Sequence, residues 1–290
     1  MSKKAFLFPG QGSQYIGMAK DLFDKSVEAK EMIKTADDAL GVNLSFIMFN
    51  GPEEQLKQTE FTQPAIFLHS VILASLIRTL QPKAAAGHSL GEYSALVSAN
   101  AIQFYDAIKL VRTRGKAMQQ AGIDNPGTLA AIVGLEPLKV EELCKEASAV
   151  GIVQCANFNS PGQIVISGSI DGVRKAMELC KANGAKLTKE LVVSGAFHSP
   201  LMQSAKDALL EALVFTSIYD ARFPVYANVT ARPVIKKDEI KNLLHQQVTS
   251  PVRWEETIRN MIADGFDEFY EIGPGKVLQG LVKRINPDVK

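Results

Sequence analysis

Three consecutive alanines lead into a serine flanked by two glycines, and this segment constrains the fold more than any other. Residues 84–86 predict a short buried strand, and residues 87–91 read Gly-His-Ser-Leu-Gly, a G-x-S-x-G pattern. A helix is expected from Leu90 to Asn100. A strand, sharp turn and helix form the setting of a nucleophile elbow, in which the serine side chain points away from both elements. We therefore interpret Ser89 as a candidate nucleophile in preference to a helix N-cap.

Strands and helices alternate along most of the chain. The strands expected outside the middle segment are residues 5–8, 84–86, 223–227 and 268–272, and the helices are residues 63–80, 90–100, 104–120, 254–263 and 276–285. This alternation predicts an α/β fold with a mostly parallel sheet covered by helices on both faces, similar to an α/β-hydrolase core. A chain of 290 residues is also long enough for a second, smaller unit.

The pattern changes after a turn-rich joint at residues 122–127. In the segment that follows, the expected strands are residues 128–133, 152–157, 163–167 and 186–193, and the helices are residues 138–147 and 172–182. The order β-α-β-β-α-β is that of a ferredoxin-like unit. We therefore predict a large α/β subdomain from residues 1–124 and 194–290, with a ferredoxin-like small subdomain, residues 125–193, inserted into it.

Composition excludes several classes of function. The 32 Lys and Arg residues balance 31 Asp and Glu residues, which argues against a nucleic-acid partner. The three cysteines, Cys144, Cys155 and Cys180, are far apart and form no CxxC pair, so we expect no metal site, no disulfide framework and a reducing cytoplasmic setting. No apolar run is long enough to span a bilayer, and the apolar start of the chain is too short for a signal peptide.

A serine nucleophile needs a base, and the chain offers four histidines. His198 lies in the loop 195–200 between an expected strand and helix, where the active sites of open α/β sheets gather. We therefore interpret His198 as the base. His69 is expected to be a satisfied core histidine, His88 to direct its side chain away from Ser89, and His245 to be exposed near a helix end.

The third member of a possible triad is not evident. The aspartates that could serve are Asp171, Asp207, Asp220, Asp264 and Asp267, and none lies in a recognisable local motif. A backbone carbonyl or a side-chain amide is the alternative partner for the imidazole.

The helix expected at residues 104–120 carries an arginine on its apolar side. Its apolar stripe consists of Phe104, Ala107, Ile108, Val111, Gly115 and Met118, and the opposite side carries Lys109, Arg112, Thr113 and Lys116. Arg114 falls on the stripe. A buried, unpaired arginine would cost about 3–5 kcal/mol, so Arg114 needs an anionic partner. That partner is either an internal carboxylate, for example Glu92, or a substrate carboxylate held by the guanidinium.

Two glycine-rich turns follow strands but match no nucleotide-binding pattern. Residues 10–17 read Gly-Gln-Gly-Ser-Gln-Tyr-Ile-Gly, which lacks both the Lys-Ser/Thr ending of a phosphate loop and the G-x-G-x-x-G spacing. Such a turn can instead direct backbone N–H groups at an oxyanion. Residues 273–276 are interpreted as a structural turn.

Together these motifs resemble those of the malonyl-CoA:acyl carrier protein transacylases of type II fatty acid synthesis. The resemblance extends over nearly the whole chain, and the segments that carry it are residues 8–14, 87–96, 114, 157–163, 195–199 and 271–278. It implies that Ser89 carries the acyl group as an ester. It also implies that His198 acts as base and then as acid, and that the backbone N–H groups of Gln11 and Leu90 form an oxyanion hole.

The resemblance further implies the substrate and the partner. Arg114 would hold the malonyl carboxylate, and the main-chain carbonyl of Gln247 would orient the histidine. The residues Ala196, Phe197 and His198 are similar to the form associated with malonyl rather than methylmalonyl units. Malonyl-CoA would be a substrate, acyl carrier protein the partner, and no cofactor would be required. We expect a cytoplasmic monomer.

Other functions compete with this interpretation. A serine hydrolase of esters or thioesters shares the G-x-S-x-G pattern, but Arg114 on an apolar stripe and the lack of a triad acid count against it. A non-enzymatic scaffold is disfavoured by the intact set of Ser89, His198 and Arg114. An acyltransferase for another dicarboxylic or polyketide extender unit remains open.

Overall fold

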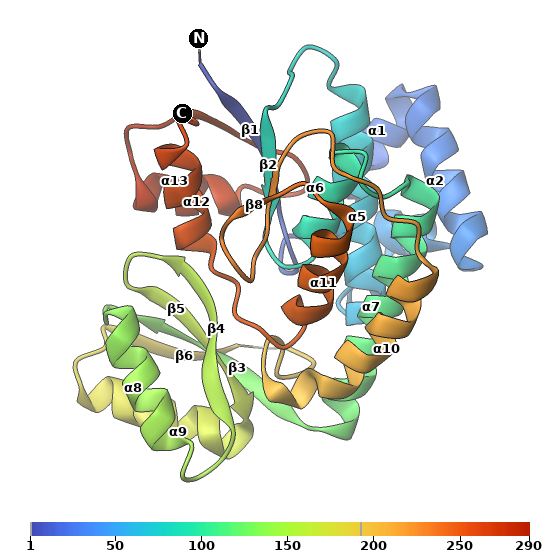
Figure 1. Cartoon of the computed structure of the whole chain (residues 1–290). Helices are drawn as coiled ribbons and strands as arrows, with labels where there is room; N and C mark the ends of the chain where they lie inside the picture. The colour runs from blue at the N-terminus through green and yellow to red at the C-terminus, as the bar shows by residue number, and fades with distance from the viewer. Residues whose placement is uncertain (1, 192) are drawn as a thin grey trace.

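The computed structural model describes residues 2–191 and 193–290, and it contains two separate sheets (Figure 1). The larger sheet has five strands in the order β8-β7-β2-β1-β9, and their bounds are β8 Pro233–Val234, β7 Val225–Tyr226, β2 Ala84–Gly87, β1 Lys4–Phe8 and β9 Glu268–Glu271. Every neighbouring pair is parallel except β7 and β8. The mostly parallel sheet of the predicted α/β fold is therefore confirmed.

Helices cover both faces of this sheet, as its apolar sequence requires. The helices of this part of the chain are α1 Lys20–Lys25, α2 Val27–Leu40, α3 Leu44–Asn50, α4 Glu53–Leu56, α5 Thr59–Leu76, α6 Gly91–Ser98, α7 Phe104–Asp124, the short 3₁₀ turn η1 Pro200–Met202, α10 Gln203–Phe215, α11 Lys237–Gln247, α12 Trp254–Ala263 and α13 Val277–Ile285. Phe6 and Phe8 of β1 pack into the large core with α5 and α7, while Ala5 and Leu7 face α12 and α13. Alternate residues of one strand therefore bury against opposite layers.

The second sheet lies in the middle of the chain and is antiparallel. Its strands, in the order β4-β5-β3-β6, are β4 Val153–Ser160, β5 Gln163–Ser169, β3 Gly127–Val133 and β6 Leu187–Leu191. Helices α8 Pro137–Ala147 and α9 Ile170–Ala182 share a separate core with it. The chain order β-α-β-β-α-β is confirmed, and Figure 1 shows this unit beside the larger one. The boundaries 125 and 193 stay a prediction.

The structure corrects two sequence expectations near Pro64. Helix α5 spans Thr59–Leu76, with Pro64 inside it, instead of the expected residues 63–80. Proline has no N–H, so it leaves the carbonyl of Glu60 without its helical donor. Arg112, expected on the solvent side of α7, donates from Nη1 to that carbonyl and is only 7% exposed. Its Nη2 also lies 2.8 Å from a carboxylate oxygen of Glu60.

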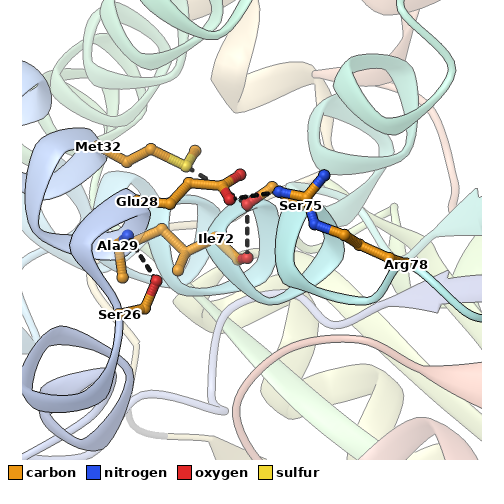
Figure 2. Close-up of polar contacts among 7 residues, drawn as sticks. All are labelled: Ser26, Glu28, Ala29, Met32, Ile72, Ser75 and Arg78. Atoms are coloured by element: carbon orange, nitrogen blue, oxygen red, sulfur yellow. Dashed lines mark hydrogen bonds and ion pairs between the residues drawn. The ribbon is translucent and has the colours of Figure 1, made fainter.

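Helix α2 also makes polar contacts with α5 and the residues that follow it, at the edge of the large core (Figure 2). Ser26 caps the start of α2, and the hydroxyl of Ser75 lies 3.5 Å from the sulfur of Met32. Glu28 and Arg78 form an exposed ion pair at 2.7 Å. Exposed pairs of this kind contribute about 0–1 kcal/mol, so the apolar contacts between the helices dominate.

Within the described ranges, no helix is long and apolar enough to cross a membrane.

The turn between β2 and α6 depends on two glycines. A Cβ on Gly87 would lie 1.9 Å from the carbonyl carbon of Gly91, and a Cβ on Gly91 would lie 2.0 Å from the carbonyl oxygen of Phe8. Both contacts are to backbone, which cannot move aside as a flexible side chain does. The glycines therefore allow α6 to start directly against β1.

We expect Gly91→Ala to lower the free energy of unfolding by about 1–3 kcal/mol or more, because the new methyl group overpacks the turn. Gly280→Ala is the matched control: it lies on α13 with no atom near its added Cβ, and it should stabilise the protein by up to about 1 kcal/mol. Urea unfolding of both variants measures the difference. Equal stability of Gly91→Ala and the unmodified protein would contradict the close approach.

Candidate active site

The turn after β2 holds the half-buried Ser89 in a strained conformation. Its φ is +52°, in the left-handed region that residues with a side chain rarely adopt. Asn228, which follows β7, braces the turn: its Oδ1 accepts a hydrogen bond from Ser89 N at 2.7 Å, and its Nδ2 donates to Gly87 O at 2.7 Å. Strain of about 1–3 kcal/mol persists only where the surroundings fix it. Sequence reasoning missed Asn228, which lies far from the elbow along the chain.

Ser89 and His198 are in direct contact. The Oγ atom of Ser89 lies 2.8 Å from Nε2 of His198. The other ring nitrogen, Nδ1, lies 2.9 Å from the carbonyl oxygen of Gln247 and 3.1 Å from that of Ser250. Carbonyl oxygens only accept, so Nδ1 carries the proton and Nε2 presents its lone pair to the serine.

His198 is held neutral. It is 3% exposed, in the loop before η1, where Ser199 caps the turn and Pro200 takes the first helical position as expected. Burial, followed by the positive charge of Arg114, lowers the pKa of His198 to about 3. An imidazole with this pKa keeps a free lone pair throughout the neutral range, which a base requires.

None of the aspartates considered from the sequence bonds to this imidazole. Asp220 forms an ion pair with Lys236, and Asp264 accepts a hydrogen bond from the Tyr226 hydroxyl. Asp267 accepts hydrogen bonds from the Ser2 hydroxyl and the Lys3 backbone N–H, just before β1. Among the described residues, the polar partners of His198 side-chain nitrogens are Ser89 and two backbone carbonyls. The alternative of a carbonyl partner is thus the one observed.

Arg114 is 1% exposed beside the serine. Its Nη1 donates to Gln63 Oε1 at 2.6 Å, and its Nη2 donates to Gln247 Oε1 at 3.0 Å and to Ser89 Oγ at 3.1 Å. Within the described part of the chain it forms no ion pair with a carboxylate, and its Nε has no hydrogen-bond partner. The helical periodicity therefore located a buried arginine, but its direct partners are neutral.

Glu92, the internal carboxylate considered for Arg114, lies one side chain further away. It is 2% exposed, and its Oε2 accepts from Asn228 N at 3.0 Å and from Gln247 Nε2 at 2.8 Å. Burial raises the pKa of Glu92 to about 7, although these hydrogen bonds and the charge of Arg114 oppose the rise. The amide of Gln247 connects the two charges.

A cavity of about 330 Å³ opens onto these groups. The larger unit contributes residues including Gln11, Ser89, Leu90, Arg114, His198 and Leu281, and the smaller unit contributes residues including Asn159, Gln163 and Val165. The backbone N–H groups of Gln11 and Leu90 donate to no residue that the structure describes. They are thus available to an atom in the cavity.

The remaining histidines lie outside the serine–histidine pair. His88 bonds through Nε2 to Asn159 Oδ1 at 2.9 Å, away from Ser89 as expected. His69 is buried, but its Nδ1 has no partner among the described residues, so the expectation of a satisfied core histidine is wrong at that atom. His245 lies in the last turn of α11 and is half-buried rather than exposed.

Known proteins share both the sequence and the fold. The family described as acyl transferase domain matches residues 5–287. A malonyl CoA-acyl carrier protein transacylase of Bacillus subtilis (strain 168) is 47% identical over 293 residues, covering 100% of this chain and 92% of that protein. The crystal structure of an acyl carrier protein S-malonyltransferase from Vibrio cholerae is 43% identical, with a TM-score of 0.96, covering 100% of this chain and 95% of that one.

A further solved structure is a malonyl-transacylase in complex with a type II PKS acyl carrier protein. It is 41% identical, with a TM-score of 0.95, and the match covers 99% of this chain and 94% of that one. Full-length agreement in sequence and fold leaves no part of the chain outside the comparison. The chain therefore belongs to the acyltransferase family that includes the malonyl CoA-acyl carrier protein transacylases.

Proposed function

We propose that this chain transfers the malonyl group from malonyl-CoA to the phosphopantetheine thiol of acyl carrier protein, supplying units for fatty acid synthesis. The observation that carries this proposal is a buried guanidinium, Arg114, whose Nη2 lies 3.1 Å from the nucleophile Ser89. A malonyl group on Ser89 has its carboxylate one methylene beyond the acyl carbon. That short reach fits a cation next to the serine, and the carboxylate would be the missing counterion.

The first half-reaction forms an ester on Ser89. His198 Nε2 takes the hydroxyl proton while Oγ attacks the thioester carbonyl carbon of malonyl-CoA. The tetrahedral oxyanion accepts hydrogen bonds from the N–H groups of Gln11 and Leu90, a contribution for which one lost donor typically costs about 10²–10³ in rate. The C–S bond then breaks, and the leaving thiolate takes the proton back from Nε2.

The second half-reaction reverses these roles. The phosphopantetheine thiol gives its proton to His198 Nε2 and attacks the malonyl ester, and Ser89 leaves with the proton returned to Oγ. The carbonyls of Gln247 and Ser250 hold the imidazole in one tautomer in both halves. Neither half-reaction changes an oxidation state, so the proposed transfer needs no redox cofactor.

The hydrolase alternative is disfavoured by the same contacts. A carboxylate in a triad stabilises the imidazolium strongly, whereas here two neutral carbonyls and a nearby arginine leave His198 with a lowered pKa. Arg114 also has no role in the hydrolysis of an uncharged acyl ester. A non-enzymatic protein with this fold would have no need for the strained backbone conformation at Ser89, which disfavours that alternative.

We place the enzyme in the cytoplasm as a monomer that meets its carrier protein at the cavity mouth. The related malonyl-transacylase solved with a type II PKS acyl carrier protein supports such an encounter. The three cysteines are free and buried, in keeping with a reducing compartment. A polyketide rather than a fatty acid pathway would use the same chemistry.

Incubation with malonyl-CoA should add one malonyl group to the protein, because Ser89 is the nucleophile. Intact mass spectrometry and peptide mapping should locate the adduct on Ser89, and Ser89→Ala should show none. Ser94→Ala, a buried serine on the helix α6 that follows the turn, is the control and should be labelled normally. Rapid release of free malonate in the absence of any carrier thiol would contradict transfer in favour of hydrolysis.

Arg114→Ala should reduce kcat/KM for malonyl-CoA about 10²-fold or more, because it removes a charge-assisted pair of about 3 kcal/mol. The rate with acetyl-CoA should change far less, since acetyl has no carboxylate. Competition between the two thioesters, read by adduct mass, measures the preference. An unchanged malonyl-to-acetyl ratio would rule out the carboxylate-binding role.

The acetylation rate of Ser89 by saturating acetyl-CoA should stay nearly constant between pH 5 and 8. The pKa of His198 is lowered to about 3, so its Nε2 lone pair remains free until the pH approaches that value. Single-turnover mass spectrometry at each pH tests this. A half-maximal rate near the ordinary histidine pKa of about 6.5 would show that the base is not held neutral in this way.

A further inference from the structure

A buried carboxylate lies next to the site, and the transfer chemistry above does not use it. Glu92 is in the first turn of α6 and is 2% exposed. Burying a carboxylate is costly unless its oxygens accept hydrogen bonds, and Oε2 accepts two, from Asn228 N and Gln247 Nε2. An apolar residue would avoid this cost, so the function of the carboxylate has to be sought in its partners.

The first effect of Glu92 is to fix the amide of Gln247. In the observed orientation, Nε2 donates to Glu92 at 2.8 Å and to Ser89 O at 2.9 Å, while Oε1 accepts from Arg114 at 3.0 Å. A flipped amide would set its NH₂ against the guanidinium and its oxygen against a carboxylate and a carbonyl. Donors would then face donors and acceptors face acceptors. Glu92 thereby directs Oε1 toward Arg114.

The second effect is electrostatic. A carboxylate in direct contact with Arg114 would occupy the guanidinium edge that a substrate carboxylate needs. Neutral amides alone would leave a buried cation without compensation, which is costly. Glu92 acts across the Gln247 amide, so its charge supports that of Arg114, while the hydrogen-bond partners of the guanidinium among the described residues are the neutral side chains of Gln63, Gln247 and Ser89.

We propose that Glu92 is a positioning residue for the malonyl carboxylate, one that holds Arg114 through Gln247 and changes its own protonation when the acyl group arrives. This inference rests on the proposed function, because it needs Arg114 to bind that carboxylate. It assigns to Glu92 the selection of malonyl over uncharged acyl groups. It gives Glu92 no contact with the reacting atoms.

Glu92 takes up a proton when the malonyl group binds, and the reason is Coulombic repulsion between the two carboxylates. A malonyl carboxylate on Arg114 places a second negative charge near Glu92, which favours the protonated form of Glu92. Burial already holds the pKa of Glu92 at about 7. The other titratable groups facing it do not change charge near neutrality: Arg114 stays charged, burial raises the pKa of Tyr93 to about 12, and His198 and His88 have lowered pKa values.

Two substitutions separate the two effects. Glu92→Gln keeps an oxygen where Oε2 accepts both hydrogen bonds, but it carries no charge at any pH. Glu92→Ala removes both the acceptor and the charge, so the NH₂ group of Gln247 loses its 2.8 Å acceptor and is held more weakly, by Ser89 O and the longer contact to Asn228 Oδ1. Ser94→Ala is the matched control, because it is a buried position on the same helix outside the described network.

The experiment measures kcat/KM for malonyl-CoA and acetyl-CoA between pH 6 and 8, with thermal unfolding of each variant. The ratio of the two values cancels the titration of the shared coenzyme. In the unmodified protein the malonyl-to-acetyl ratio should fall about three- to tenfold as the pH rises, because ionised Glu92 repels the malonyl carboxylate. In Glu92→Gln the ratio should be independent of pH and near the low-pH value.

Glu92→Ala should lower the ratio about tenfold or more at every pH, and Ser94→Ala should behave as the unmodified protein. If the malonyl-to-acetyl ratio of Glu92→Gln fell with pH as it does in the unmodified protein, the proposal would be overturned, even if the alanine variant did not fold. An equal decrease of kcat/KM for malonyl-CoA and acetyl-CoA in Glu92→Ala would also overturn it. If the unmodified protein did not prefer malonyl-CoA, or if Arg114→Ala kept the preference, the proposed function itself would fail.

Discussion

The site is organised around one buried cation, Arg114, which forms no ion pair with a carboxylate of any residue that the structure describes. Arg114 lies on the apolar side of α7, where it cannot lose its proton and is only 1% exposed. Two glutamine side chains and the serine hydroxyl satisfy part of its donor set. The arrangement is stable enough to fold and yet incomplete without an anion, which is the property that a selective carboxylate site requires.

The proposed nucleophile, Ser89, depends on a second constraint, its left-handed backbone turn. The turn is possible because Gly87 and Gly91 leave room for close backbone contacts, and Asn228 bonds to both sides of it. Asn228 also donates its own N–H to Glu92. The elbow and the arginine network are therefore one connected set of hydrogen bonds, so a change in either is expected to affect the other.

Much of this site could be predicted from local sequence. Ser89 follows from a strand–turn–helix pattern, Arg114 from helical periodicity, and His198 from a loop between a strand and a helix. The carbonyl of Gln247 came only from the family resemblance, since nothing in its own segment marks it. Local patterns work where chemistry depends on spacing along one element.

The rest depends on side chains that meet from distant segments. Asn228 and Glu92 are 136 residues apart, and no periodicity relates them. Arg112 is buried because Pro64 frees a carbonyl on a neighbouring helix, which the sequence of α7 alone cannot indicate. His69 and His245 likewise depart from expectation because their surroundings are set by packing between helices.

The most direct test is the structure of the protein carrying malonate as an ester on Ser89. The account predicts that the malonyl carboxylate lies within hydrogen-bonding distance of the Arg114 guanidinium, with the ester carbonyl oxygen directed at the N–H groups of Gln11 and Leu90. It also predicts that Gln247 keeps its amide oriented toward Glu92. A carboxylate directed into solvent, with Arg114 still bonded only to Gln63, Gln247 and the Ser89 oxygen, would contradict the central claim.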